Sequence, residues 1–334
     1  MTSLTIYTDT FCATGCSYCG YSSKTVNKAT YGFERLRNFC DFLRPNRIIP
    51  FGGDVYYDKK QIHNITDFIC TLPYVKNVGI VSELPKLDRD IPLIAEVNKK
   101  LKNAGKNFSL QLSLDLEGPK ADFSKIKYLD DLTKIFNNNS RLLTTVITTK
   151  SLMEESYKKP FKEMMEICDK TNSFIKIKFN FDYNAIYYRV EGLEAKTEEF
   201  LKTIYYTTHV IPFIADRKFG CRIGNSFTVA IDGTIDGCWH IKTGEIMANS
   251  TFSALDMTKE TFEKLMKYQP KYKKEYTNKY CEKCEAKDYC FRCKKHIHVN
   301  KNFDGTQAVC QFYKTFEKVR NRADERPYKG FFKW

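Results

Sequence analysis

Short apolar runs rich in β-branched and aromatic residues alternate with amphipathic stretches over the first 215 residues. The apolar runs have the length of strands, and the stretches between them carry apolar residues at helical spacing. The strand candidates are Leu4–Thr8, Arg47–Phe51, Asn77–Val81, Phe108–Leu114, Leu142–Thr148 and Phe174–Phe181. The helix candidates span 32–43, 60–70, 91–104, 122–136 and 152–170. Six βα units of about 30 residues predict an α/β fold with a parallel sheet and right-handed crossovers, whose functional residues follow the strands.

Beyond residue 215 this alternation stops, and the chain becomes rich in cysteine and lysine. The elements expected there are a β-hairpin with an Asp-Gly turn, a Lys-rich helix and a terminal helix, over 226–238, 258–280 and 308–323. We therefore expect two domains, 1–215 and 216–334.

Charge and hydropathy narrow the class of protein. The chain has 54 Lys and Arg residues against 40 Asp and Glu residues, a net charge of +14. No apolar run approaches the ~18 residues that a membrane-spanning helix needs. The first residues lack the basic and then apolar pattern of a signal peptide. These features predict a globular cytoplasmic protein without a membrane partner.

Ten of the 13 cysteines form a pattern. The patterned cysteines are Cys12, Cys16 and Cys19 near the start, and Cys221, Cys238, Cys281, Cys284, Cys290, Cys293 and Cys310 toward the end. The other three (Cys40, Cys70 and Cys168) stand alone among apolar neighbours, and we interpret them as small buried residues.

Clustered thiolates bind either zinc or iron–sulfur clusters. Zinc ribbons place about 15–20 residues between two C-x2-C pairs. Here Cys284 and Cys290 are separated by five residues. Such a compact run favours a cubane cluster over zinc, because one tight loop reaches its several iron atoms.

The first cysteine run is C-x3-C-x2-C, with Tyr18 before its last cysteine, and it directly follows the first strand candidate. This run resembles that of the radical S-adenosylmethionine (SAM) superfamily. The resemblance implies a partial (βα)6 TIM-like barrel with a 4Fe–4S cluster whose open iron binds SAM. It also implies an enzyme that cleaves SAM reductively to a 5′-deoxyadenosyl radical, which abstracts a hydrogen atom from the substrate.

The resemblance also suggests residues that contact SAM. Gly52, Gly53 and Asp54 follow the second strand candidate and resemble the family's Gly-Gly-Glu motif, which receives the amino group of SAM; a plain turn is the alternative. Ser113 and Asp115 match the positions that contact the ribose and the carboxylate. Further candidates at the ends of neighbouring strands are Ser82, Glu83, Thr148 and Thr149. No residue stands out as a catalytic acid or base.

The later cysteines resemble the SPASM extension of radical SAM enzymes, a small, loop-rich domain that holds auxiliary iron–sulfur clusters. The resemblance implies two sets of ligands, Cys281, Cys284, Cys290 and Cys310 for one cluster, and Cys221, Cys238 and Cys293 for the other. The fourth ligand of the second cluster is open, with His240 as a candidate. The middle run ends in C-x2-C where the family has C-x3-C. Trp239 stands where sulfatase maturases carry an Asp.

Two substrate classes remain. The SPASM resemblance implies modification of a peptide or protein, with a flavodoxin-type reductant. The alternative is modification of nucleic acid, such as rearrangement of an amino-acyl-modified thymidine in phage DNA, because net charge, 25 Phe and 21 Tyr suit a polyanion with exposed bases. The basic candidates are Lys271, Lys273, Lys274, Arg320, Arg322 and Arg326. A solvated face or a docking patch for an acidic electron donor would explain them equally.

Overall fold

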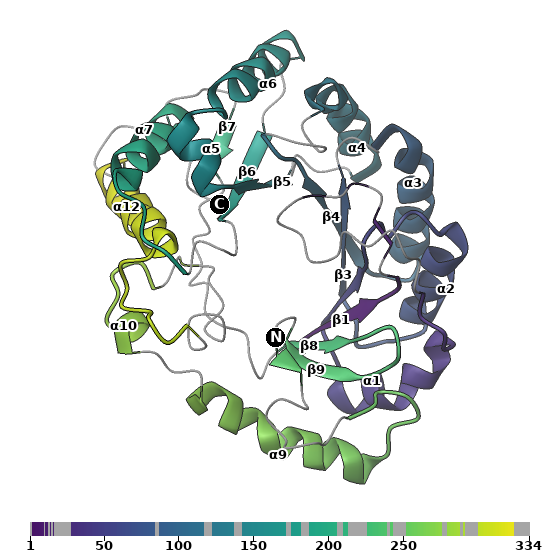
Figure 1. Ribbon diagram of the computed structural model, residues 1–334. Coiled ribbons are helices and arrows are strands. Elements are labelled where there is room, and N and C mark those ends of the chain that lie inside the picture. The colour runs from purple at the N-terminus through teal and green to yellow at the C-terminus, as the bar shows by residue number, and fades with distance from the viewer. Residues whose placement is uncertain are drawn as a thin grey trace. The chain divides into compact units, whose positions relative to one another are not determined.

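Figure 1 shows the computed structural model of the chain. It describes residues 2–9, 11–12, 14, 16, 28–83, 87–116, 122–136, 142–171, 175–181, 187–205, 210–212, 226–238, 241–242, 252–275, 279–287, 290 and 300–323. These residues belong to two compact units. The first unit comprises 1–113, 128–139 and 222–276, and the second comprises 114–127, 140–221 and 277–334.

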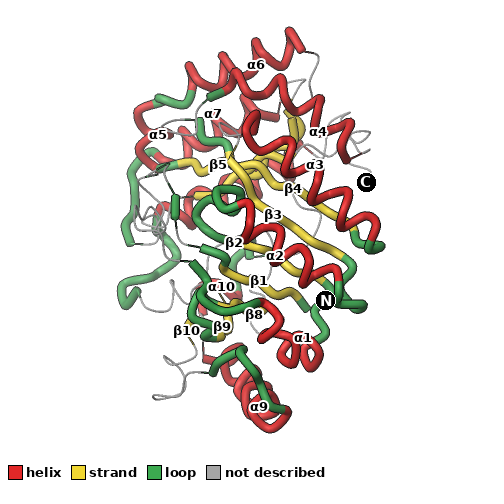
Figure 2. Tube along the Cα trace, turned by 90° about the vertical axis from the view of Figure 1, so that its right-hand side faces the viewer, coloured by secondary structure: helices red, strands yellow, loops and turns green. Residues whose placement is uncertain are grey.

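Four parallel strands form the centre of the first unit. In chain order its elements are β1 (Ser3–Tyr7), η1 (Phe33–Leu36), α1 (Arg37–Leu43), β2 (Arg47–Phe51), α2 (Lys59–Cys70), β3 (Asn77–Glu83), α3 (Leu87–Asn103), β4 (Asn107–Ser113) and α4 (Leu129–Phe136). β2 pairs in parallel with β1 and β3, and β3 pairs in parallel with β4. Figure 2 shows α2 and α3 on one face of these strands. The carboxyl ends of the four strands therefore lie along one edge of the sheet.

Capping and amphipathicity explain why the helices form where they do. The Asp58 carboxylate accepts a hydrogen bond from the backbone N–H of Gln61 at 3.1 Å, which caps α2 at its N-terminus. Ile62, Ile65 and Ile69 repeat at three and four residues and are fully buried. One face of α2 is thereby fixed against the sheet.

A hairpin extends the sheet on the other side of β1. It consists of β8 (Ser226–Val229) and β9 (Ile235–Cys238), which are antiparallel, as the sequence predicts, and β10 (Ile241–Lys242) pairs with β9. Gly233 adopts φ +85° in the turn. β8 itself pairs in parallel with β1, and the Ser3 and Ser226 hydroxyls share a hydrogen bond of 2.6 Å. This pairing is why residues 226–238 belong to the first unit, next to the strand that precedes the first cysteines.

A buried aromatic contact closes the base of the hairpin. The rings of Phe39 from α1 and Phe227 from β8 meet edge to face, with centroids 6.0 Å apart. Phe262 from α9 (Lys259–Glu275) packs against Phe39 from the other side, at 6.3 Å. Helix α9 is thus attached to the hairpin's end of the unit.

The second unit also combines parallel strands with helices. Its elements are η4 (Phe123–Tyr128, whose last residue falls in the first unit), β5 (Leu142–Ile147), α5 (Thr149–Glu154), α6 (Lys158–Thr171), β6 (Ile175–Phe181), α7 (Leu193–Tyr205), β7 (Val210–Pro212), α10 (Lys279–Glu282) and α12 (Ala308–Ala323). β6 pairs in parallel with both β5 and β7. Helices α7 and α12 lie side by side, as Figure 1 shows.

The α/β class and the parallel strands agree with the sequence prediction, and they are compatible with a partial TIM-like fold. All six strand candidates are strands within two residues at either end, and the terminal helix spans the predicted 308–323. Helix α7 and strand β7 were not predicted. The predicted boundary between residues 215 and 216 falls in 213–225, outside the described residues. None of the described helices has the length and apolar character needed to cross a bilayer.

A buried lysine provides a test of the first unit. Lys106 donates from Nζ to the carbonyl oxygens of Leu72 at 2.7 Å and Val75 at 3.0 Å, where the chain leaves α2. Replacing Lys106 with Met leaves both carbonyls without this donor, so we expect a loss of about 1–3 kcal/mol in the free energy of unfolding. Lys102→Met is the control, because Lys102 is exposed. Equal denaturant midpoints for the two variants would contradict this role of Lys106.

Candidate functional site

The first cysteines lie just beyond β1, at the carboxyl edge of the parallel strands. Cys12 is 8% exposed and Cys16 is 4% exposed. The Phe11 ring packs on the Tyr57 ring, with centroids 4.3 Å apart, and so attaches this loop to the segment after β2. Two of the three thiols of the C-x3-C-x2-C run are therefore buried together at the end of the first strand.

Gly53 lies so close to the backbone of this loop that it leaves no room for a side chain, whereas Gly52 faces the Asp9 carboxylate. A Cβ on Gly53 would overlap the carbonyl of Phe11 and come within 2.8 Å of the Cys12 Cβ. A Cβ on Gly52 would lie 2.9 Å from both carboxylate oxygens of Asp9. Gly53 is thus required for close backbone approach, which a plain turn would not require. At Gly52 a side chain would displace the Asp9 carboxylate.

Glu83, at the end of β3, contacts the cysteine loop directly. Its Oε1 accepts a hydrogen bond from the Cys12 thiol at 3.4 Å, and its Oε2 accepts one from the Thr14 hydroxyl. Glu83 is 7% exposed. Ser113 lies beside it in the ladder of β3 and β4. The ends of β1, β2 and β3 therefore meet at Cys12.

Asp54 takes part in an ion-pair network instead of facing solvent. Arg89, from the first turn of α3, places Nη2 3.2 and 3.3 Å from the two carboxylate oxygens of Asp54. The same guanidinium donates from Nε to Asp90 at 2.6 Å, and Ser82 donates to Asp90 at 3.2 Å. Asp54 is buried, so Arg89 compensates the charge that burial would otherwise make costly.

Asp9 is a second buried carboxyl group at the same edge. It accepts hydrogen bonds from the Gly53 backbone N–H at 3.3 Å and from the Thr8 hydroxyl at 3.1 Å. Burial outweighs these bonds and raises the pKa of Asp9 to about 6. Asp9 therefore joins the end of β1 to the glycine pair.

The remaining strand-end candidates lie in the second unit. Asp115 and Thr149 are buried there. The Thr149 hydroxyl shares a hydrogen bond of 2.8 Å with the Tyr188 hydroxyl. Thr148 caps α5, because its hydroxyl accepts from the Ser151 N–H at 3.0 Å. The two threonines thus have local structural roles.

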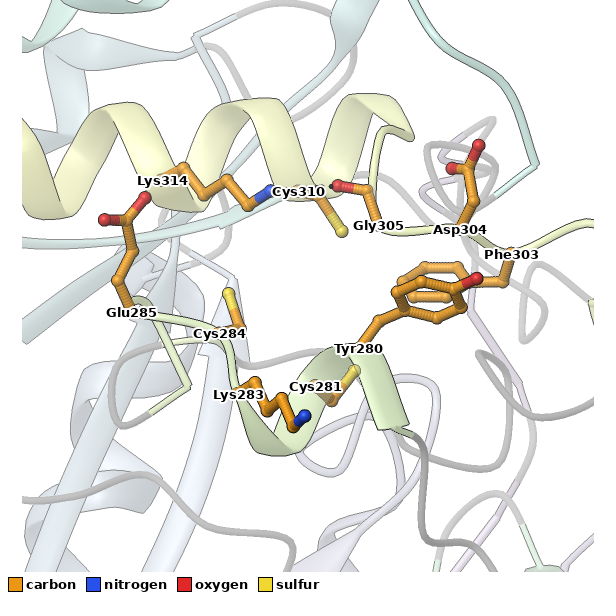
Figure 3. Close-up of a pocket in the computed structure, with 10 residues that line it drawn as sticks. All are labelled: Tyr280, Cys281, Lys283, Cys284, Glu285, Phe303, Asp304, Gly305, Cys310 and Lys314. Carbon is orange, nitrogen blue, oxygen red and sulfur yellow. Dashed lines mark hydrogen bonds between the residues drawn. The ribbon is translucent and has the colours of Figure 1, made fainter.

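The C-terminal cysteines surround a cavity of about 280 Å³ in the second unit. Figure 3 shows Cys281 from α10, Cys284 from the following turn and Cys310 from α12, with their sulfur atoms bordering one opening. Burial, with the proximity of Cys290, Cys281 and Cys284, raises the pKa of the Cys310 thiol to about 12. The four cysteines assigned to one auxiliary cluster are therefore neighbours, although they span residues 281–310.

Two kinds of metal site use thiol ligands. Among the described residues, no three Cys, His, Asp or Glu side chains converge as ligands of a single metal ion. Tetrahedral zinc with Zn–S bonds of about 2.3 Å requires sulfurs within about 4 Å of one another. A cubane binds each thiolate to a different iron atom, so its ligands surround a wider space. Three thiols that line one cavity are a donor set that both kinds of site use.

Several predicted residues lie outside the described part of the chain. They are Tyr18, Cys19, Cys221, Trp239, His240, Cys293 and Arg326. Cys238 ends β9, but its side chain is not among those described, and the same holds for Cys168 in α6. Of the isolated cysteines, Cys40 is fully buried and Cys70 is partly buried, with its thiol 3.9 Å from the Lys100 carbonyl.

Two residues of the site were not identified from the sequence. Asp9 lies just after the end of β1, as Glu83 lies at the end of β3. A polar residue at the end of a strand was therefore the signal that could have identified Asp9. Arg89 carried no such signal, because it lies in a helix and reaches Asp54 only through the fold.

Comparison with models of known protein families gives no match to this chain, and comparison with curated proteins gives none either.

The close approach of Gly53 predicts the effect of one added methyl group. Gly53→Ala should displace the Phe11–Cys12 backbone, lower the melting temperature and expose the Cys12 thiol. Alkylation of Cys12, followed by mass spectrometry, should accelerate relative to wild type. Gly32→Ala is the matched control, since a Cβ there meets no atom within 4 Å. Indistinguishable alkylation rates in the two variants would refute the packing argument.

The raised pKa of Asp9 predicts how stability depends on pH. In the unfolded chain Asp9 titrates near 3.8 and in the folded protein near 6, so folding retains its proton between these values. Wild type should therefore lose stability relative to Asp9→Asn as the pH rises from about 4 to about 6, by up to about 3 kcal/mol. Above pH 6 the difference should remain constant.

Urea unfolding of both proteins across this pH range measures that difference. Asp58→Asn is the control, because Lys28 lowers the pKa of Asp58 below its ordinary value of 3.8, so its charge does not change across the upper part of this pH range. Its difference from wild type should be flat between pH 5 and 7. A flat profile for Asp9→Asn would contradict the assignment.

Proposed function

We propose that the chain is a radical SAM enzyme with SPASM-type auxiliary clusters that modifies a peptide or protein in the cytoplasm. The observation that carries this proposal is the meeting of Cys12, Gly53 and Glu83 at the carboxyl ends of three adjacent parallel strands. Ligands of open α/β sheets bind at this edge. The cysteine-lined cavity of the second unit supports the auxiliary clusters.

Different residues of the first unit would bind the cluster and SAM. Cys12, Cys16 and Cys19 would hold a 4Fe–4S cluster, which together with SAM would supply the radical chemistry for hydrogen abstraction. Gly52 and Gly53 keep the adjoining surface free of side chains. Water is excluded by the burial of both described thiols.

The ion pair of Asp54 changes which carboxylate would receive the amino group of SAM. Asp54 is engaged by Arg89, whereas Glu83 contacts the cysteine loop itself. This difference supports Glu83 as the partner of the amino group, with Asp54 fixing the start of α3. Ser113, next to Glu83, would remain a candidate contact of the ribose.

In the second unit, Cys281, Cys284, Cys290 and Cys310 would hold an auxiliary cluster. Cys221, Cys238 and Cys293 would hold another. Tyr280 and Phe303 flank the cysteine-lined cavity, with ring centroids 6.4 Å apart. These rings would cover one side of the first auxiliary cluster and separate it from water. A flavodoxin-type protein is the proposed reductant.

Metal content tests this proposal. Anaerobically reconstituted protein should bind about 12 iron and 12 sulfide, four for each cluster. Replacing Cys12, Cys16 and Cys19 together with Ala should remove about four of each and abolish 5′-deoxyadenosine formation from SAM under dithionite. Cys70→Ala, outside every cysteine motif, should leave both measurements unchanged. Stoichiometric zinc, or undiminished SAM cleavage in the triple variant, would reject the proposal.

A further inference from the structure

A second cavity of about 380 Å³ lies in the second unit, along α7 and α12. It shares Glu285, Gly305 and Lys314 with the cysteine-lined cavity, so the two adjoin. We call it the charged groove. The lining residues that carry charge are Arg189, Glu194, Glu198, Glu285, Lys314 and Lys318.

The charges of this groove are balanced and partly unpaired. It carries three carboxylates and three cationic groups, in a chain whose net charge is +14. One of the lining carboxylates is paired, because the Lys202 Nζ lies 2.8 Å from Glu198 Oε1. By contrast, Arg189, Glu194, Glu285 and Lys318 form no hydrogen bond or ion pair with any described residue. Charged groups of both signs thus line the groove, and these four do not pair with one another across it.

The groove has a fixed frame. The buried Gln311 side chain pairs with the backbone of Val190 as a strand would, donating to its carbonyl at 2.8 Å and accepting from its N–H at 3.0 Å. The N–H of Ala308 also donates to the Tyr188 carbonyl at 2.7 Å. Both neighbours of Arg189 are therefore bonded to α12, which fixes the backbone of Arg189 at the groove.

One lining group is a hydroxyl that can bond to a peptide backbone. It belongs to Thr315, a residue that is 5% exposed. A hydroxyl both donates and accepts, so it can serve an amide N–H or C=O of a ligand. A volume of about 300–1,000 Å³ is usual for binding sites, and this groove lies in that range.

We propose that the charged groove binds a peptide segment that carries one acidic and one basic side chain. The acidic side chain would meet Arg189 and Lys318, and the basic one would meet Glu194 and Glu285, so a single ligand pairs charges of both signs. A nucleic acid fits poorly, because its phosphates would approach three carboxylates. This inference rests on the proposed function only in naming the peptide as substrate.

Three acetylated and amidated hexapeptides test the proposal, with the sequences Gly-Lys-Gly-Gly-Glu-Gly, Gly-Lys-Gly-Gly-Lys-Gly and Gly-Glu-Gly-Gly-Glu-Gly. Ligand-observed NMR with the full chain should give the tightest binding for the mixed peptide. Lys318→Glu should weaken that binding about fivefold and strengthen binding of the two-lysine peptide. Glu194→Gln should weaken binding of the mixed and the two-lysine peptides and leave binding of the two-glutamate peptide unchanged.

Lys159→Glu is the control, since it makes the same change in net charge on α6, outside the groove. Equal affinities for the three peptides, or equal effects of Lys318→Glu and Lys159→Glu, would overturn the proposal. The proposal would also be overturned if an oligothymidine bound more tightly than the mixed peptide and this binding were lost in Lys318→Glu. The peptide assay measures binding alone, so a negative result there says nothing against iron binding or SAM cleavage. Failure of the proposed function would instead appear as absence of bound iron and of SAM cleavage.

Discussion

The position of Cys12 depends on one backbone contact, the approach of Gly53 to the carbonyl of Phe11. Two strands that are parallel and adjacent bring their carboxyl ends together, but only a residue without a side chain lets the loops beyond them touch. Asp9 reinforces this contact from the end of β1, and Glu83 does so from the end of β3. The cysteine loop is thereby held by backbone packing and by two buried carboxyl groups, and the Cys12 and Cys16 thiols are buried.

Local sequence was sufficient to predict the strands, because each is a short apolar run bounded by a helical pattern. Helix α7 was missed for the opposite reason: its sequence mixes charged and apolar residues, and its apolar face becomes evident only where it packs on α12. The pairing of β8 with β1 could not be predicted either. Periodicity reports which residues form a strand, and it carries no information about a partner more than 200 residues away.

The same distinction applies to the candidate site. The glycine pair and the cysteine spacing are short motifs, so the sequence was enough to single them out. The interaction of Arg89 with Asp54 joins a helix to a turn, and the balance of charges along α7 and α12 joins segments more than 100 residues apart. Such contacts arise from tertiary packing. They can change the role inferred for a motif residue, as the ion pair with Arg89 does for Asp54, although the motif itself is the same.

The parallel pairing of β8 with β1 also constrains the order in which the protein can fold during synthesis. Ser3 and Ser226 are 223 residues apart, so one edge of β1 stays unpaired until the hairpin has left the ribosome. At about 5–20 residues per second, translation takes roughly 10–45 s to cover that distance. During that interval the nascent chain exposes a strand edge beside its first cysteines, and such edges readily pair with other chains. A chaperone that binds extended segments would therefore protect this protein throughout that interval, while β1 has only β2 as a neighbour.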